Sequence, residues 1–199
     1  TVLSAEDEVA YSLSCIDMQT DLYKMINEGD TVTEDFNVLT DRYTGKFIKF
    51  TFKEANDLIV VDENGRAVIY PEGDGNNAAT LVATATYSKD GVEYTATKDI
   101  PLVIGISPKG EVDKILNGDN KIVLNADDEK PVDLTKVQCD LKFVNKIGDI
   151  VFTDWKVDNS LFEENKDVYE ISSDKIKTAD GKITATATYV KNGKELYST

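Results

Sequence analysis

A fifteen-residue stretch occurs twice in this chain, and the repeat limits the folds that the sequence can adopt. The first copy, at residues 81–95, reads LVATATYSKDGVEYT, and the second, at residues 183–199, reads ITATATYVKNGKELYST. At an offset of 102 residues, 8 of the first 15 positions are identical. A repeat of roughly 100 residues is too long for a solenoid unit and has the size of a small domain. The sequence therefore predicts two copies of one domain.

Each copy has the pattern of a β-hairpin. Alanine and threonine alternate through its first half, and Asp90-Gly91 or Asn192-Gly193 then stands at the turn. A two-residue type I′ turn needs positive φ at both central residues, which Asn, Asp and Gly adopt at the lowest cost. Because alternating residues flank this turn signal on both sides, we expect two hairpins.

Short alternating runs with turn signals between them continue through the rest of the chain, which is typical of β-sandwiches. We predict an all-β fold of two tandem immunoglobulin-like β-sandwiches, residues 1–105 and 106–199, the second with a truncated last strand. A linker is expected at residues 105–110. A short helical segment near the N-terminus, within residues 7–27, would end at Gly29. Among the expected strands are residues 31–39, 46–53 and 100–104.

Other parts of the two halves also match. Residues 24–30 resemble residues 114–119, which predicts a similar opening segment in each domain. At an offset of 103, Phe52 corresponds to Trp155, the single tryptophan. Tyr87 and Tyr189 precede the two turns. We interpret these four aromatic residues as core residues, since recurrence in both copies favours a structural role over stacking on a sugar.

Composition excludes several classes of partner. The net charge of −15 opposes binding to nucleic acids and to anionic membrane surfaces, because both rely on Lys and Arg. No apolar run is long enough to span a membrane. The two cysteines, Cys15 and Cys139, fall one in each half at positions that do not correspond, so we expect both to be reduced and partly buried.

An enzymatic function is not expected. The chain contains no histidine, which removes Ser-His-Asp and Cys-His catalysis and the commonest transition-metal ligand. No glycine-rich phosphate loop is present. A pair of catalytic carboxylates would need a cleft, which two small sandwiches rarely offer.

Calcium is the one cofactor that the sequence suggests. Glu72, Asp74 and Asn76 lie in a loop, residues 71–78, that has no counterpart in the second half. Asp62 with Asn64, and the acidic run at residues 127–129, form two further groups. Oxygen ligands on turns suit Ca²⁺, but none of these groups has EF-hand spacing. A solvated acidic loop is the favoured interpretation, and a calcium site at Glu72, Asp74 and Asn76 is the alternative.

Several motifs resemble bacterial Ig-like domains. Residues 152–159, FTDWKVDN, are similar to their ITW-x-S-x-N strand and turn, and residues 180–189, DGKITATATY, are similar to the later strands. The first half matches through residues 49–53, 62–65 and 81–91, although Phe52 replaces the tryptophan. The resemblance covers residues 30–104 and 135–197.

This resemblance implies an exported bacterial protein, secreted or held at the cell surface, whose export signal would lie outside these residues. Relatives serve as tandem spacers or adhesive segments in surface proteins and in large polysaccharide-degrading enzymes. The expected function is therefore a non-catalytic spacer and presentation module whose partners are other domains of a longer chain. The alternative is adhesion or carbohydrate binding, to a glycan or a host protein, through end loops such as residues 71–78.

Overall fold

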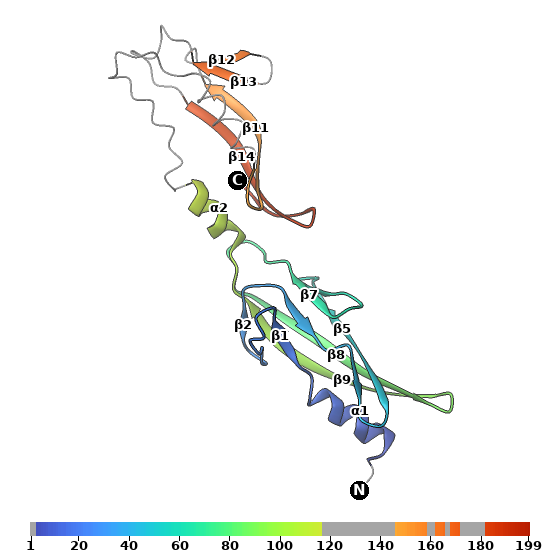
Figure 1. Ribbon diagram of the computed structural model, residues 1–199. Helices are drawn as coiled ribbons and strands as arrows, with labels where there is room; N and C mark the ends of the chain where they lie inside the picture. The colour runs from blue at the N-terminus through green and yellow to red at the C-terminus, as the bar shows by residue number, and fades with distance from the viewer. Residues whose placement is uncertain (1–2, 117–145, 159–161, 166–167, 172–181) are drawn as a thin grey trace. The chain divides into compact units, whose positions relative to one another are not determined.

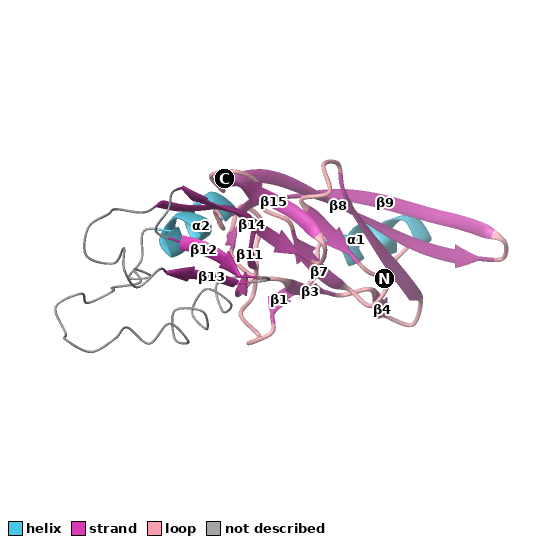
Figure 2. Cartoon of the chain, turned by 90° about the horizontal axis from the view of Figure 1, so that it is seen from above, coloured by secondary structure: helices cyan, strands magenta, loops and turns pink. Residues whose placement is uncertain are grey.

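The computed structural model describes residues 3–116, 146–158, 162–165, 168–171 and 182–199 (Figure 1). Contacts divide the chain into two units, Thr1–Ser107 and Pro108–Thr199. The division falls two residues after the expected boundary, at the point where a helix begins. Strands predominate over helices in the described residues, which confirms the predicted all-β class (Figure 2).

The first unit contains two sheets. The four-stranded sheet has the order β1-β3-β7-β6, formed by β1 (Met18–Thr20), β3 (Phe36–Val38), β6 (Ile59–Val61) and β7 (Arg66–Ile69). The five-stranded sheet has the order β2-β9-β8-β5-β4, formed by β2 (Thr31–Val32), β4 (Asp41–Tyr43), β5 (Phe47–Glu54), β8 (Asn77–Lys89) and β9 (Val92–Ile104). Neighbouring strands are antiparallel except β2, which runs parallel to β9.

Side chains from both sheets meet in a single core. Phe36 and Ile69 from the four-stranded sheet and Leu81 and Ile104 from the five-stranded sheet are fully buried in one cluster. Burial alternates along β5 and β8, as expected when one face of a sheet is covered and the other meets solvent. The first unit is thus sandwich-like, with its core between the two sheets.

Helix α1 (Ala5–Leu13) precedes the strands and packs against β8 and β9. The Ser4 side chain caps its first turn by accepting a hydrogen bond from the Asp7 amide at 3.1 Å. Glu8 accepts a hydrogen bond from Thr44 and pairs with Lys46 at 3.5 Å, which joins the helix to the β4–β5 turn. The prediction that helical turns would end at Gly29 is wrong, because α1 ends at Leu13.

Both predicted hairpins are present. Strands β8 and β9 pair along their whole length, and φ is 51° at Asp90 and 79° at Gly91. The second hairpin pairs β14 (Lys182–Lys191) with β15 (Lys194–Ser198), with φ of 49° and 77° at its two turn residues. Positive φ at both central residues fits the type I′ turn that the sequence indicates. The strand expected at residues 100–104 is the end of β9.

The single strand expected at residues 31–39 is instead two strands in different sheets. Val32 lies in β2 of the five-stranded sheet, and Phe36 lies in β3 of the four-stranded sheet. Between them, the Asp35 carboxylate accepts a hydrogen bond from the Ile69 amide at 3.0 Å, which holds the crossing segment to β7. One alternating run therefore supplies buried residues to both sheets.

The second unit begins with helix α2 (Pro108–Leu116), which packs against β14 and β15. A sheet of order β10-β11-β14-β15 adds β10 (Lys146–Ile147) and β11 (Ile150–Asp158), and β12 (Phe162–Asn165) pairs with β13 (Val168–Ile171). Val112, Ile150, Phe152 and Ala187 are buried together. Because α2 starts at Pro108, the expected linker shortens to residues 105–107.

The two helices correspond at an offset of 103 residues, since α1 starts at Ala5 and α2 at Pro108. Each buries a valine, Val9 or Val112, and each packs against the repeated hairpin of its unit. The predicted match of residues 24–30 with residues 114–119 is wrong, because residues 24–30 connect β1 to β2 while residues 114–116 end α2.

Two β-bulges explain why the offset between the copies changes from 102 to 103. Phe50 lies opposite Ala85, and Phe152 lies opposite Ala187, at an offset of 102. After an irregularity at Asp154, where φ is 52°, Lys156 lies opposite Thr184 as Lys53 lies opposite Val82.

A second bulge lies in β15. Tyr189 pairs with Tyr197 as Tyr87 pairs with Tyr94, although β15 carries one additional residue, Leu196, between the paired positions. Both bulges preserve the cross-strand pairs on either side of the additional residue.

Candidate functional site

The loop that the sequence suggests for calcium is a compact turn before β8. Glu72, Asp74 and Asn76 are exposed, and Asn76 has a φ of 54°. The Asn77 side chain accepts a hydrogen bond from the Glu72 amide at 2.8 Å and donates one to the Glu72 carbonyl at 3.2 Å. In the part of the chain that the structure describes, no group of three or more His, Cys, Asp or Glu side chains could hold a metal ion. A calcium site in this loop stays the alternative to the favoured interpretation of a solvated acidic loop.

Of the two further acidic groups, only Asp62 with Asn64 lies in the described residues. One oxygen of Asp62 accepts hydrogen bonds from the amides of Asn64 and Arg66, at 2.8 and 2.9 Å. Asp62 therefore shapes the turn between β6 and β7, as Asp often does in turns. Residues 127–129 lie outside the described residues.

The predicted core aromatics lie at the borders of the cores. Phe52 and Tyr87 are half-buried against the core of the first unit, and Tyr189 is half-buried against that of the second. The rings of Tyr87 and Tyr94 stack with their centres 6.4 Å apart. The Trp155 backbone lies in β11, and its side chain is outside the described residues.

Cys15 is a free, half-buried thiol just after helix α1. A hydrogen bond with Arg42 lowers the pKa of this thiol, and a second hydrogen bond with Ser14 acts in the same direction. The Arg42 guanidinium also lies 5.4 Å from the centre of the Tyr11 ring. These contacts join the end of α1 to β4. Cys139 lies outside the described residues.

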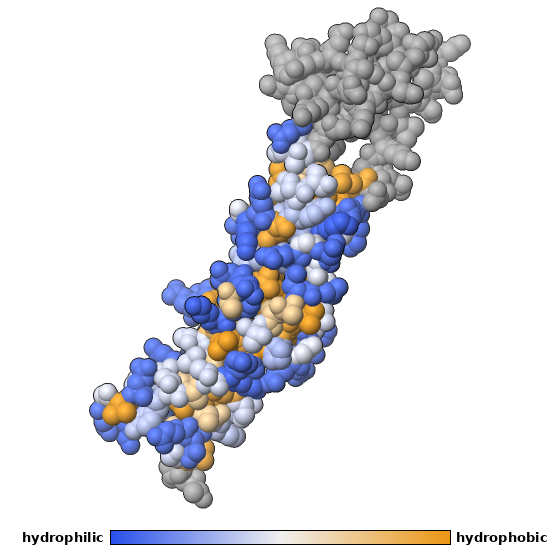
Figure 3. Space-filling view, turned by 180° about the vertical axis from the view of Figure 1, so that it is seen from behind, coloured by the Kyte–Doolittle hydropathy of each residue, from blue (hydrophilic) through white to orange (hydrophobic). Residues whose placement is uncertain are grey.

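The most exposed apolar side chains of the described residues lie in the connection between β1 and β2. On the face shown in Figure 3, hydrophobic residues form only small patches among hydrophilic ones. A group of exposed apolar side chains in one connection is therefore a candidate interaction site. Leu22 is 85% exposed, Tyr23 81% and Met25 47%. Tyr23 has a φ of 61°, a left-handed conformation that is rare for a bulky residue. Backbone strain of this kind clusters at functional sites.

Hydrogen bonds hold this connection in place. The Thr20 amide donates to the Lys24 carbonyl at 2.9 Å, and the Lys24 amide donates to the Thr20 hydroxyl at 3.2 Å. These two bonds close a tight turn around Tyr23. Asp21 accepts two hydrogen bonds from Arg66, at 2.5 and 3.1 Å. The hydrogen bond from Arg66 has the larger effect and that from Asn37 the smaller, and both hold the pKa of the Asp21 carboxyl below its usual range. The charged carboxylate thus anchors the turn to β3 and β7.

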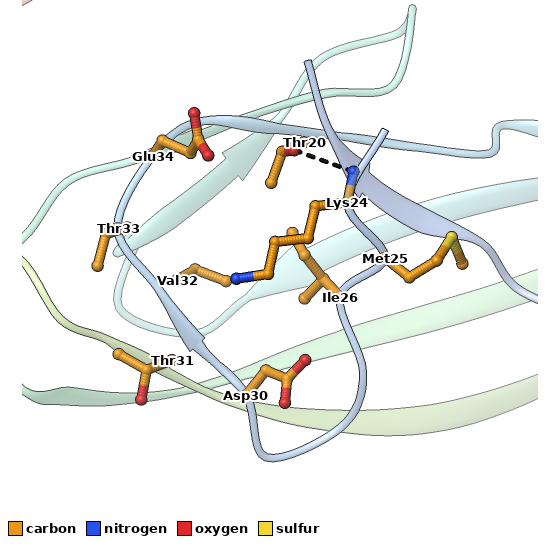
Figure 4. Close-up of a pocket in the computed structure, with 9 residues that line it drawn as sticks. All are labelled: Thr20, Lys24, Met25, Ile26, Asp30, Thr31, Val32, Thr33 and Glu34. Carbon is orange, nitrogen blue, oxygen red and sulfur yellow. Dashed lines mark hydrogen bonds between the residues drawn. The ribbon is translucent and has the colours of Figure 1, made fainter. Parts of the chain in front are cut away.

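A pocket of about 210 Å³ lies beside this turn. Its lining is mostly polar, and its side chains come from Thr20, Lys24, Met25, Ile26, Asp30, Thr31, Val32, Thr33 and Glu34. The Lys24 side chain extends across the pocket toward Val32, while Asp30 lies at the lower rim (Figure 4). Ammonium, carboxylate and hydroxyl groups here surround a small apolar floor at Ile26. The pocket offers hydrogen bonds to a small polar ligand.

Sequence reasoning did not identify this turn or this pocket. The sequence predicts a short helical segment within residues 7–27, and this prediction includes Leu22 and Tyr23 without indicating a turn at that point. The positive φ of Tyr23 carries no signal in the residue type, since Tyr is not a residue that favours it. The adjacent Asp21 anchors the turn to Arg66, which lies 45 residues further along the chain, so this contact also gives no local pattern.

Comparisons of the chain with protein-family models, with curated proteins and with solved structures each returned no match. No helix in the described ranges is long and apolar enough to span a membrane.

Proposed function

We propose that the chain is a non-catalytic tandem immunoglobulin-like segment of an exported bacterial protein, acting as a spacer that presents other domains of a longer chain. The strand order of the first unit supports this proposal. With β1, β3, β6 and β7 as strands A, B, D and E, the four-stranded sheet reads A-B-E-D. With β5, β8 and β9 as C, F and G, the other sheet contains C-F-G. Leaving aside β2 and β4 at the edges of the five-stranded sheet, this order is similar to that of an immunoglobulin constant-type sandwich, which supports the proposal.

The parallel pairing of β2 with β9 is the observation that carries the mechanical role. Thr31 lies beside Val103 and Val32 beside Ile104, with both strands running in the same direction. A pull on the two ends of the unit moves such strands in opposite directions along their length. The hydrogen bonds between them are then loaded together in shear, whereas a hairpin pulled from its open end breaks them one at a time.

Three of the backbone hydrogen bonds that cross this contact join a paired strand to a residue beside the other strand. The amides of Val103 and Gly105 donate to the carbonyls of Asp30 and Val32, at 3.0 and 2.8 Å. The Gly29 amide donates to the Pro101 carbonyl at 2.7 Å. Glycine at position 105 allows this approach, because a Cβ there would lie 2.5 Å from the Thr31 side chain. These bonds form the load-bearing contact of the spacer.

Force spectroscopy on the whole chain tests this role. Val103→Pro removes the amide that donates to the Asp30 carbonyl, so we expect the unfolding force of the first unit to fall. Its unfolding event is recognised by a contour-length gain of about 3.5 Å per residue. Val103→Ala is the matched control, because it shortens the same side chain and keeps the amide. Equal unfolding forces for the two variants would rule out this load-bearing contact.

A second function, carbohydrate binding in adhesion, is favoured by the exposed turn and the pocket beside it. The aromatic ring of Tyr23 and the aliphatic side chain of Leu22 can cover the apolar face of a sugar. Lys24, Asp30 and the threonine hydroxyls can bond to sugar hydroxyls. For this second function we propose residues 20–34 as the binding surface, beside the end loop at residues 71–78 that the sequence suggests.

A glycan array with the whole chain tests the second function. We expect any glycan that binds to be bound at least roughly tenfold more weakly by Tyr23→Ala, because a central aromatic residue supplies much of a binding free energy. Tyr43→Ala is the matched control, since Tyr43 is 76% exposed and lies in β4. Equal losses in both variants, or no bound glycan, would remove this function and leave the spacer role intact.

A further inference from the structure

Strand β5 has an open edge in the five-stranded sheet. Strand β4 covers only its first part, and the last hydrogen bond runs from the Phe50 amide to the Thr40 carbonyl at 2.8 Å. Beyond this point, no strand among the described residues pairs with β5 on the side away from β8. Alternate residues of an antiparallel strand direct their N–H and C=O groups to the same edge. The Phe52 backbone groups therefore face the open edge, as those of Phe50 face β4.

The surface is hollowed on both sides of this edge. One depression, of about 540 Å³, lies on the outer face beside Lys53, Val82 and Thr84. Another, of about 380 Å³, follows the edge from the outer-face residues Phe47 and Lys49 to Phe50, Val61 and Asp62 on the side of the other sheet. Thr51 and Phe52 line both depressions. An added strand directs alternate side chains to opposite faces of a sheet, and here each face has room to receive one.

We propose that residues 51–53 of β5 form a binding site for an extended peptide of another protein, which adds to the sheet as an antiparallel strand in line with β4. The backbone groups of Phe52 would supply the hydrogen bonds, and the two depressions would select the side chains. This mode of recognition derives affinity from the main chain and specificity from alternate pockets.

The charges on the outer face of the edge define the outward side chains of the peptide, whereas Asp62 and Glu63 beside the second depression disfavour a carboxylate there. Lys49 and Lys53 are exposed on the outer face, and Asp41 lies directly opposite Lys49 in the existing strand pair. An acidic residue opposite Lys53 would repeat this arrangement, since opposite charges across strands are favourable. The position opposite Phe52 points toward Phe50 and Val61 and requires an apolar side chain. The peptide thus alternates acidic or small polar residues with apolar ones.

Lys53 also disfavours a second copy of this chain as the occupant. Because β4 covers the edge up to Phe50, two β5 edges can pair only about Phe52, which sets Lys53 of each copy opposite Thr51 of the other on one face. Each lysine then has no opposite charge across the pair, and lysine on an edge strand commonly prevents pairing between copies. A heterologous peptide can instead place a carboxylate opposite Lys53.

The corresponding edge of the second unit is different. In β11, the irregularity at Asp154 falls at the position that matches the open edge of β5. A bulge of this kind interrupts the regular spacing of backbone groups that a new strand needs. The regular edge is therefore a feature of the first unit.

Fluorescence polarisation with a labelled peptide of about nine residues, the length of a long strand, tests this site on the whole chain. In the peptide, valine alternates with glutamate or threonine, with valine opposite Phe52 and glutamate opposite Lys53. The control peptide has the same sequence with N-methyl groups on the valines, which removes the amides that face β5. We expect saturable binding of the first peptide and at least roughly tenfold weaker binding of the second.

Charge reversal gives an independent readout. Lys53→Glu should weaken binding of the glutamate peptide roughly three- to tenfold and favour a peptide with lysine in place of that glutamate. Lys89→Glu, an equally exposed change near the hairpin turn, should leave both affinities unchanged. The proposal is overturned if the unmethylated peptide does not bind, if the methylated peptide binds equally well, or if the two lysine variants behave alike.

Discussion

Replacing Phe36 with alanine is expected to lower the free energy of unfolding of the first unit by about 3–5 kcal/mol. Phe36 is fully buried and lies in β3, between β1 and β7 of the four-stranded sheet. Its ring contributes to the cluster in which both sheets meet, so its loss leaves a cavity between them. A cavity adds to the lost burial because a packed core relaxes only partly around it.

Urea denaturation followed by tyrosine fluorescence measures this change. Phe47→Ala is the matched control, since Phe47 is 51% exposed on the outer face of β5 and is expected to cost less than about 1 kcal/mol. If Phe36→Ala costs no more than Phe47→Ala, the two sheets do not share a packed core.

The second large effect is expected at Gly65, which is buried in the turn between β6 and β7. Its φ of +84° is left-handed, and a Cβ added there would lie 2.2 Å from the Val38 carbonyl oxygen. The Gly65 carbonyl also accepts a hydrogen bond from the Val38 amide at 2.8 Å, so β3 and the β6–β7 turn cannot move apart without breaking this bond. Gly65→Ala should therefore lower the free energy of unfolding by roughly 3–4 kcal/mol.

Gly45 provides the control for the backbone contribution. Its φ is also +84°, but a Cβ there meets no atom within 4 Å. Gly45→Ala should therefore cost only the left-handed backbone strain, about 1–2 kcal/mol. The difference between the two variants in urea denaturation isolates the contact with Val38. Equal costs would mean that β3 and the β6–β7 turn are not in close contact at Gly65.

Features with short-range causes could be predicted from the sequence. The Asp90-Gly91 turn and the alternation on either side of it lie within a few residues of each other, and the hairpin forms as expected. The alternation in β5 similarly places Ile48 and Phe50 in the core. Local patterns succeed where the residues that form a structure are also neighbours in the chain.

Features that depend on distant contacts were not predictable in this way. The crossing between β2 and β3 depends on a bond from Ile69 to Asp35, and the anchored turn at Tyr23 depends on Arg66. Helix α2 was missed because Pro108 and Gly110 read as linker residues. Proline is nevertheless well suited to the first position of a helix, where its missing amide hydrogen has no partner to lose.

The candidate sites show the same limit. Sequence comparison identified Phe52 as a counterpart of Trp155, and the strand register agrees with that correspondence around the bulge in β11. Periodicity alone could not show that β4 begins only at Asp41 and therefore leaves the edge beside Phe52 open. An edge is a property of the whole sheet, whereas an alternating run reports only which face is buried.

The two-residue turns also bear on how a chain with two similar hairpins reaches the correct pairing. Tandem domains of similar sequence are prone to misassembly in which a strand of one domain pairs with the other. Strands β8 and β14 correspond residue for residue, so β15 could pair with β8 through the same bulge at Leu196 that it forms with β14. Register therefore does not distinguish the two pairings. The Asn192-Gly193 turn does, because it holds β15 next to β14 in the chain and lets this hairpin form before β15 can meet a strand of the other unit.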